Sequence, residues 1–176
     1  MSMRGTVESV LLSEPEIQQR IDLLGEEINR DYAGRELLAV CLLKGSVVFM
    51  SDLIRRLQMP LTIDVMRASS YGDATESSGS VKILQDLDRD ISGLDVLVVE
   101  DIVDTGRTLA KTLDLLRFRQ PRSLKICTLL DKPSRREVQI PIDYTGFVIE
   151  DHFVVGYGLD FDEHYRQLPY IGILKL

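Results

Sequence analysis

The stretch Val96-Leu-Val-Val-Glu-Asp-Ile-Val-Asp-Thr-Gly-Arg-Thr-Leu109 is the one from which the fold of the chain is inferred. Its first four residues are apolar and predict a fully buried strand of a parallel sheet that ends at Val99. Two adjacent acids follow, and then a short loop leads into a helix with leucines at positions 109, 113 and 116. A strand that ends in acids before a Thr/Gly loop suits a phosphorylated ligand held near a metal ion. Backbone N–H groups and the helix dipole favour an anion there.

An ordinary turn between a strand and a helix is the alternative explanation. Many central strands end with an acid, and Asp or Thr commonly caps the following helix. Here, however, three carboxylates lie within five residues: Glu100, Asp101 and Asp104. Like charges this close repel one another unless a cation or a polyol bridges them. The clustering therefore favours a ligand site, in which Gly106 would allow close approach of the backbone.

Composition limits the possible classes of protein. The chain has 176 residues, of which 44% are hydrophobic and 28% charged, so we expect one globular domain over residues 1–176. No apolar run approaches the roughly 18 residues that span a bilayer, and no secretory signal is visible, so we expect a cytoplasmic protein without a membrane segment. A net charge of −7 disfavours nucleic acid as a partner. Cys41 and Cys127 lie in apolar runs without a Cys-x-x-Cys pair, which predicts buried thiols rather than a zinc site.

The hydrophobic pattern predicts strands that alternate with helices. A capping box at Ser13-Glu-Pro-Glu16 starts a helix with an apolar stripe, which we expect to end near Gly34. Further helices are expected up to about residue 57 and over residues 107–119. Strands are expected over residues 37–43, 61–67, 80–86 and 124–130, with an edge strand in 168–176. Residues 1–12 would be an extended lead-in. The fold class is therefore α/β, a mostly parallel sheet of about five strands with helices on both faces.

The stretch from Val96 to Thr108 resembles the thirteen-residue phosphoribosyl diphosphate (PRPP) binding motif of the type I phosphoribosyltransferases. That motif has four apolar residues, two acids, two apolar residues, Asp, Thr or Ser, Gly, a variable position and Thr, and every position matches. Other segments resemble the hypoxanthine-guanine branch of this family. The resemblance implies a small hood over the sheet and a substrate site that includes Glu100, Asp101, Ile102, Val103, Asp104, Thr105, Gly106, Arg107 and Thr108.

The resemblance assigns roles within this motif. Glu100 and Asp101 would face the ribose hydroxyls and bind Mg²⁺. Residues 104–108 would hold the 5′-phosphate through backbone and hydroxyl donors. Asp104 is the candidate catalytic residue, for proton transfer at N7 of the purine.

Two further segments have both an ordinary and a functional interpretation. For Leu43-Lys-Gly-Ser46, spacing alone favours an ordinary turn, but the segment resembles the family's pyrophosphate-binding loop, formed around Lys44 and Gly45 and often containing a non-proline cis peptide. The polar run of residues 68–80 is either a disordered surface loop or an active-site lid. In the second case Ser70 and Tyr71 match the family's Ser-Tyr pair.

The base-binding residues are inferred from the last third of the chain. Lys132 after a strand is usually a solvated edge residue, but it matches the lysine that binds the exocyclic O6 of a purine. An ammonium only donates hydrogen bonds, so it prefers a 6-oxo to a 6-amino group. Phe153 is either a core aromatic or the residue that stacks on the base. The resemblance further assigns the purine edge to the backbone of Val154, a second metal ion and pyrophosphate to Asp160, and pyrophosphate to Arg166.

The expected reaction follows from these assignments. The 5-phosphoribosyl group of PRPP would pass to hypoxanthine, and to guanine, giving IMP or GMP and pyrophosphate in purine salvage. Mg²⁺ would be held by Glu100, Asp101 and Asp160. The family implies a homodimer or a homotetramer. Two alternatives remain open: a xanthine-preferring sibling enzyme, and a PRPP-sensing regulator, which would need a basic surface or an added DNA-binding domain.

Overall fold

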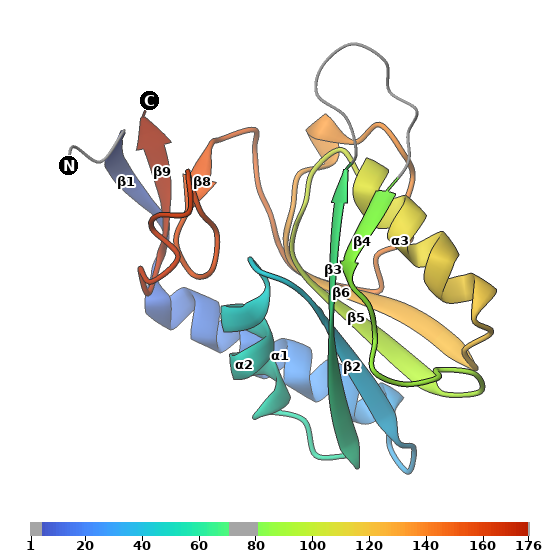
Figure 1. The fold of residues 1–176 in the computed structure, drawn as a ribbon. Coiled ribbons are helices and arrows are strands. Elements are labelled where there is room, and N and C mark those ends of the chain that lie inside the picture. Colours follow the sequence, from blue (N-terminus) through green and yellow to red (C-terminus); the bar gives the residue numbers. More distant parts are fainter. Residues whose placement is uncertain (1–4, 71–80, 176) are drawn as a thin grey trace.

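A six-stranded sheet forms the centre of the computed structural model, which describes residues 5–70 and 81–175 (Figure 1). The strand order is β4-β3-β2-β5-β6-β7. The strands from β3 to β7 are parallel to their neighbours, and only β4 runs antiparallel, beside β3 at one edge. The mostly parallel sheet is therefore confirmed. Strand β4 corresponds to the strand predicted over residues 80–86, and the strand that was not predicted is β7 at the opposite edge. The strands are β2 (Leu37–Leu42), β3 (Leu61–Ser70), β4 (Val81–Gln85), β5 (Asp95–Val103), β6 (Ser123–Asp131) and β7 (Tyr144–Val148).

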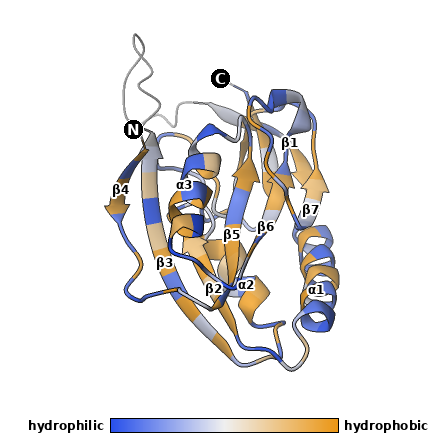
Figure 2. Ribbon diagram, turned by 90° about the vertical axis from the view of Figure 1, so that its right-hand side faces the viewer, coloured by the Kyte–Doolittle hydropathy of each residue, from blue (hydrophilic) through white to orange (hydrophobic). Residues whose placement is uncertain are grey.

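Helices cover both faces of this sheet, as predicted. Helices α1 (Glu14–Asp31) and α2 (Val47–Ile54) pack on one face, and α3 (Arg107–Phe118) packs on the other. Successive side chains of a strand point to opposite faces, so Leu97 and Val99 join the core under α1 and α2, whereas Val96 and Val98 contact the core under α3. The buried residues of the central strands are mostly apolar, with buried polar exceptions such as Asp95 in β5 and Thr128 in β6 (Figure 2).

The start of α1 confirms the predicted capping box. Ser13 N–H donates to Glu16 Oε2 at 2.8 Å, and Glu16 N–H donates to Ser13 Oγ at 3.4 Å. The predicted stripe, Ile17, Ile21, Leu24 and Ile28, is fully buried. The helix ends at Asp31, slightly before the predicted glycine. Helix α2 ends at Ile54 rather than at residue 57, because the following residues form turns that return the chain to Pro60 and β3.

A separate three-stranded antiparallel sheet forms the expected hood. It has the order β1-β9-β8, from β1 (Thr6–Leu12), β9 (Ile171–Lys175) and β8 (Val154–Val155). It lies beside the carboxyl ends of the central strands, and both described ends of the chain belong to it (Figure 1). The prediction of an edge strand at the C-terminal end was wrong. The lead-in segment is itself a strand, so β9 lies between two partners.

Two strands extend further than predicted. Strand β5 does not end at Val99 but runs through the acids to Val103, because β6 continues to Asp131 and pairs with it there. Strand β3 reaches Ser70, which pairs with Val81 of β4. Tyr71 and most of the predicted lid lie outside the described residues. Of the helices in the part of the chain that is described, none has the length and apolar character needed to span a membrane.

Candidate active site

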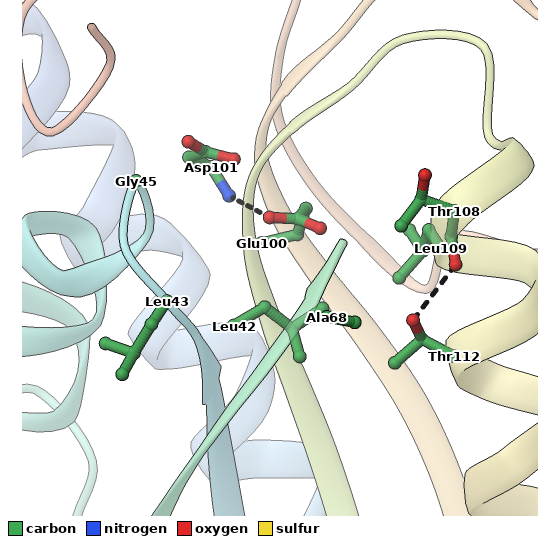
Figure 3. A pocket seen from close by; sticks show the side chains of 9 residues that line it. All are labelled: Leu42, Leu43, Gly45, Ala68, Glu100, Asp101, Thr108, Leu109 and Thr112. Atoms are coloured by element: carbon green, nitrogen blue, oxygen red, sulfur yellow. Dashed lines mark hydrogen bonds between the residues drawn. The ribbon is translucent and has the colours of Figure 1, made fainter. Parts of the chain in front are cut away.

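A pocket of about 200 Å³ opens where β2, β3 and β5 end and α3 begins. Glu100 and Asp101 from β5 lie between Gly45 on one side and Thr108 on the other (Figure 3). A second pocket of about 160 Å³ shares Glu100 and Thr108 with the first and follows the loop from residue 102 to 106. The two pockets therefore place the predicted pyrophosphate loop and the predicted phosphate loop on either side of Glu100, and Asp101 lines the first pocket beside it.

The two carboxylates have unusual electrostatics. Asp101 N–H donates to Glu100 Oε1 at 3.1 Å, and Ile102 N–H donates to Asp101 Oδ1 at 2.7 Å. Burial raises the pKa of Glu100 well above its usual range, and the neighbouring charge of Asp101 raises it further. Burial also raises the pKa of Asp101. Two crowded oxygen-donor carboxylates of this kind suit a hard divalent cation, which would relieve their repulsion.

Gly45 is in close contact with Asp101 on one side and with Gly158 on the other. A Cβ atom on Gly45 would lie 1.7 Å from Asp101 Oδ2. A Cβ atom on Gly158, which has a φ of +96°, would lie 2.1 Å from the Gly45 carbonyl oxygen. The Leu43–Lys44 peptide is cis, as the resemblance implied. Only glycine at position 45 therefore allows the loop to lie directly against the Asp101 carboxylate.

The loop of residues 104–106, called the phosphate loop below, leads into the N-terminus of α3. Gly106 is the N-cap residue, with a φ of 82° and no side-chain capping bond. Among the described residues, no hydrogen bond uses the backbone N–H of Thr105 or Gly106. These donors and the first turn of α3 are therefore available to an anion.

Gly106 also permits a close contact within the protein itself. A Cβ atom there would lie 2.8 Å from the Val138 carbonyl oxygen and 2.9 Å from Ile140 Cδ1. The close approach that glycine allows is therefore to the chain's own segment after β6, in addition to the left-handed backbone that the turn requires.

Asp104 is the first residue of the phosphate loop. Its side chain is 43% exposed, and Arg135 Nε donates to its Oδ1 at 3.3 Å. The Asp104 carbonyl oxygen accepts from Arg136 Nε at 3.1 Å. The carboxylate is thus accessible to a ligand while its backbone is anchored.

Lys132 is not the solvated edge residue of the ordinary interpretation. Its side chain is only 8% exposed, and Nζ lies 3.5 Å from Asp151 Oδ1. The ammonium also donates to the carbonyl oxygen of His152, which precedes Phe153. The structure therefore brings Lys132 and the predicted stacking residue together.

Phe153 is not a core aromatic. It is 45% exposed, and its ring meets that of Phe161 edge to face, with centroids 5.4 Å apart. Val154 is buried in β8 and pairs with Ile173 of β9. An exposed ring held by a short strand is an available platform for a planar ligand.

Arg166 links the hood to the Gly45 loop. Its Nη1 donates to the Gly158 carbonyl oxygen at 2.8 Å, and its Nη2 lies 3.0 Å from Asp160 Oδ1 and 3.4 Å from Glu163 Oε2. Arg166 Nε is buried, with no partner in the described part of the chain. Lys44 Nζ donates to the same Glu163 oxygen at 2.8 Å. Lys44, which belongs to the predicted pyrophosphate loop, and Arg166, the cation predicted for pyrophosphate, thus share one carboxylate.

The predicted metal ligands do not form a single cluster. Across residues 5–70 and 81–175, no group of three or more His, Cys, Asp or Glu side chains is placed to hold a metal ion. Asp160 instead accepts from Arg166 and from Glu163 N–H, the latter at 2.9 Å. Glu100 and Asp101 remain a fitting pair, because Mg²⁺ commonly takes one or two carboxylates and completes its shell with water and substrate phosphate.

Sequence reasoning missed three residues at this site: Arg135, Arg136 and Glu163. All three contact predicted site residues. Their sequence neighbourhoods are ordinary polar turns, so nothing in the spacing distinguishes them. Of the predicted lid pair, Ser70 is the last residue of β3, and Tyr71 is not described.

Comparison with known proteins gives consistent matches. The family model of the phosphoribosyl transferase domain matches residues 9–162. A hypoxanthine phosphoribosyltransferase from Salmonella typhimurium is 54% identical over 176 residues, which cover 99% of this chain and 98% of the relative. The crystal structure of a hypoxanthine phosphoribosyltransferase from Staphylococcus aureus superposes with a TM-score of 0.93 at 51% identity, covering 96% of this chain and 92% of that chain.

A third kind of relative is longer. The bifunctional protein TilS/HprT of Listeria monocytogenes is 53% identical over 174 residues, which are 99% of this chain. The chain spans only 27% of the length of that relative.

Proposed function

Because this chain belongs to the phosphoribosyl transferase family, and within it to the hypoxanthine phosphoribosyltransferases, we propose that it transfers the 5-phosphoribosyl group of PRPP to hypoxanthine and guanine. The products would be IMP or GMP and pyrophosphate. Phosphoribosyl transfer in purine salvage is the activity of the group as a whole. The choice of bases, the use of Mg²⁺ and the residue roles are the proposal.

One observation carries the proposal. The carboxylate pair of β5, the uncapped start of α3 and the buried ammonium of Lys132 all lie at the carboxyl ends of neighbouring parallel strands. This edge is where open α/β sheets bind their ligands. The three groups offer one partner each to a ribose, a phosphate and a 6-oxopurine.

The phosphate loop would hold the 5′-phosphate. The N–H groups of Thr105 and Gly106 and the first turn of α3 donate toward it, and Thr108 adds a hydroxyl. On the other side of the carboxylates, the backbone at Gly45 and the partly buried Arg166 would hold the pyrophosphate. The sugar is then fixed between its two ends.

Glu100 and Asp101 would act on the ribose. As the bond from C1 to pyrophosphate breaks, positive charge develops on the sugar ring, and two carboxylates beside it stabilise that charge. The same pair would hold Mg²⁺, which when bound neutralises charge on the departing pyrophosphate. Their raised pKa values fit this role, because a bound cation removes the cost of keeping both groups ionised.

Lys132, Phe153 and Asp104 would act on the base. The Lys132 ammonium donates to the 6-oxo group, and the exposed face of Phe153 stacks on the ring. Asp104, whose carboxylate is accessible, accepts the proton from N7 while N9 of the base bonds to C1 and pyrophosphate leaves. Specificity for 6-oxopurines follows, because a 6-amino group would meet the ammonium donor to donor.

The test is an absorbance assay of purified protein with PRPP and Mg²⁺, offered hypoxanthine, guanine, xanthine and adenine in turn. Turnover of hypoxanthine and guanine, abolished by a chelator and restored by Mg²⁺, is the expected result. A clear preference for xanthine would support the sibling enzyme instead. Turnover of adenine would contradict the role of Lys132. The predicted homodimer or homotetramer is a separate proposal, which sedimentation of the same sample tests.

A further inference from the structure

Arg136 lies inside the protein although it carries a charge. Its side chain is 9% exposed. Its Nη2 pairs with the carboxylate of Asp131, the last residue of β6, whose side chain is 14% exposed. Its Nε donates to the carbonyl oxygen of Asp104 at 3.1 Å. One guanidinium therefore joins the chain just after β5 to the end of β6.

The residues after Arg136 contact the same loop. The N–H groups of Glu137 and Val138 both donate to the Thr105 carbonyl oxygen, at 2.9 and 3.1 Å. The Val138 carbonyl oxygen lies so close to Gly106 that a Cβ atom on this residue would be only 2.8 Å from it. Residues 136–138 thus contact all three residues of the phosphate loop.

These contacts also fix the distance to the base-binding lysine. Asp131 directly precedes Lys132, and the N–H of Lys132 donates to the Val103 carbonyl oxygen at 3.0 Å. The Arg136 side chain bridges Asp131 and Asp104, so it spans from the residue before the lysine to the residue that opens the phosphate loop.

We propose that Arg136 is a positioning residue for the transfer reaction, which holds the phosphate loop and Asp104 at a set distance from Lys132. This inference rests on the proposed function, since it needs the loop to bind the sugar phosphate and Lys132 to bind the base. Arg136 acts through Asp104 and Asp131, and not by contact with the reacting atoms. A buried ion pair is often no more stabilising than apolar residues of similar volume, so stability alone does not explain its place beside the loop.

Two variants test this role. Arg136→Lys keeps a cation for Asp131 but cannot present the Nε donor to the Asp104 carbonyl while pairing as a guanidinium does. The pair Asp131→Asn with Arg136→Met removes both contacts without leaving a buried charge unpaired. We expect kcat with hypoxanthine to fall about 10- to 100-fold in the double variant, with a raised KM for PRPP, because displacements near 1 Å have costs of this order. The lysine variant should fall between the double variant and the wild type.

Arg20→Met is the matched control. Arg20 is also an arginine that anchors backbone, and its side chain is 27% exposed. Its Nε donates to the Gly146 carbonyl oxygen at 2.9 Å, and its Nη2 donates to that of Thr145 at 2.7 Å. It joins α1 to β7, away from the pockets. We expect this variant to lower the thermal midpoint while kcat and KM of the folded protein stay at wild-type values.

The possible outcomes distinguish the proposed function from the positioning role of Arg136. A wild-type protein that does not convert PRPP and hypoxanthine would remove the proposed function itself. An active wild type with Arg136 variants that match it in kcat and KM would overturn the positioning role alone. If the double variant does not fold, Arg136→Lys decides the question, and wild-type kinetics in it overturn the proposal. Equal kinetic losses in Arg20→Met and the Arg136 variants would also overturn it, since the effect would then be one of stability.

Discussion

Replacing Gly45 by alanine would place a methyl group 1.7 Å from Asp101 Oδ2. That separation is about 1.8 Å shorter than the roughly 3.5 Å of a normal non-bonded contact. The clashing atom is the end of a side chain, so the Asp101 carboxylate can turn away while the sheet keeps its structure. The substitution should therefore impair activity more than it lowers the stability of the fold.

We expect kcat/KM for PRPP to fall on the order of 100-fold, because a catalytic group displaced by about 1 Å has an effect of that size. Gly146→Ala is the control. Gly146 lies in β7, and a Cβ atom there would be 2.4 Å from the backbone carbonyl oxygen of Leu129. The clashing atom belongs to the backbone, which cannot move aside as a side chain can. Overpacking against backbone costs about 1–3 kcal/mol of stability, so this variant should melt earlier but keep its kinetic constants.

Steady-state kinetics and thermal melts of both variants form the assay, and a double-mutant cycle refines it. In an Asp101→Ser background the clash is absent, so adding Gly45→Ala should change kcat/KM little. The reasoning is refuted if Gly45→Ala keeps wild-type kcat/KM. It is refuted equally if the 100-fold loss persists in the serine background.

Four further predictions follow from individual contacts. Asp104→Asn should lower kcat about 10²- to 10⁴-fold, the range for a lost acid–base group, with little change in PRPP binding, and wild-type turnover would exclude the proton-transfer role. Lys132→Met should raise the KM for hypoxanthine about 10- to 100-fold, as expected for a lost charge-assisted hydrogen bond, while an equal rise in the KM for PRPP would contradict its assignment to the base. Glu163→Gln should tighten product inhibition by pyrophosphate about 2- to 5-fold, since it releases Lys44 from an exposed ion pair, and weaker inhibition would count against that competition. Hydrogen bonds from two arginines and a serine hold the pKa of Asp95 far below its usual range. Its contribution to stability is therefore present above about pH 4, the pKa of Asp in the unfolded chain, and is lost as the pH falls below that value. In urea melts from pH 6 to pH 3, the free energy of unfolding should decline less steeply in Asp95→Asn than in the wild type.

The fold was largely predictable from local patterns. The capping box at Ser13 and the apolar stripe of α1 are short-range signals, and both appear as expected. Strand ends were less predictable, because the partner decides them. Strand β5 continues to Val103 only because β6 offers partners as far as Asp131. The place of β9 depends likewise on β1, which lies at the other end of the chain.

Some residues of the site could likewise be predicted from the sequence, and others could not. The PRPP motif, Lys132 and Phe153 were found because they form ordered motifs in the sequence, and the structure brings them to one edge of the sheet. Arg136 and Glu163 act through single long-range contacts that no spacing reveals. The close contact of Gly106 with Val138 could not be predicted for the same reason, since Val138 lies over thirty residues away in the chain.

The most direct measurement of the central claim is a crystal structure of the protein with PRPP and Mg²⁺. We expect the 5′-phosphate against the N–H groups of Thr105 and Gly106, the ribose hydroxyls at Glu100 and Asp101, and the pyrophosphate at Gly45. PRPP bound at another surface, or a ribose turned away from the two carboxylates, would contradict this expectation.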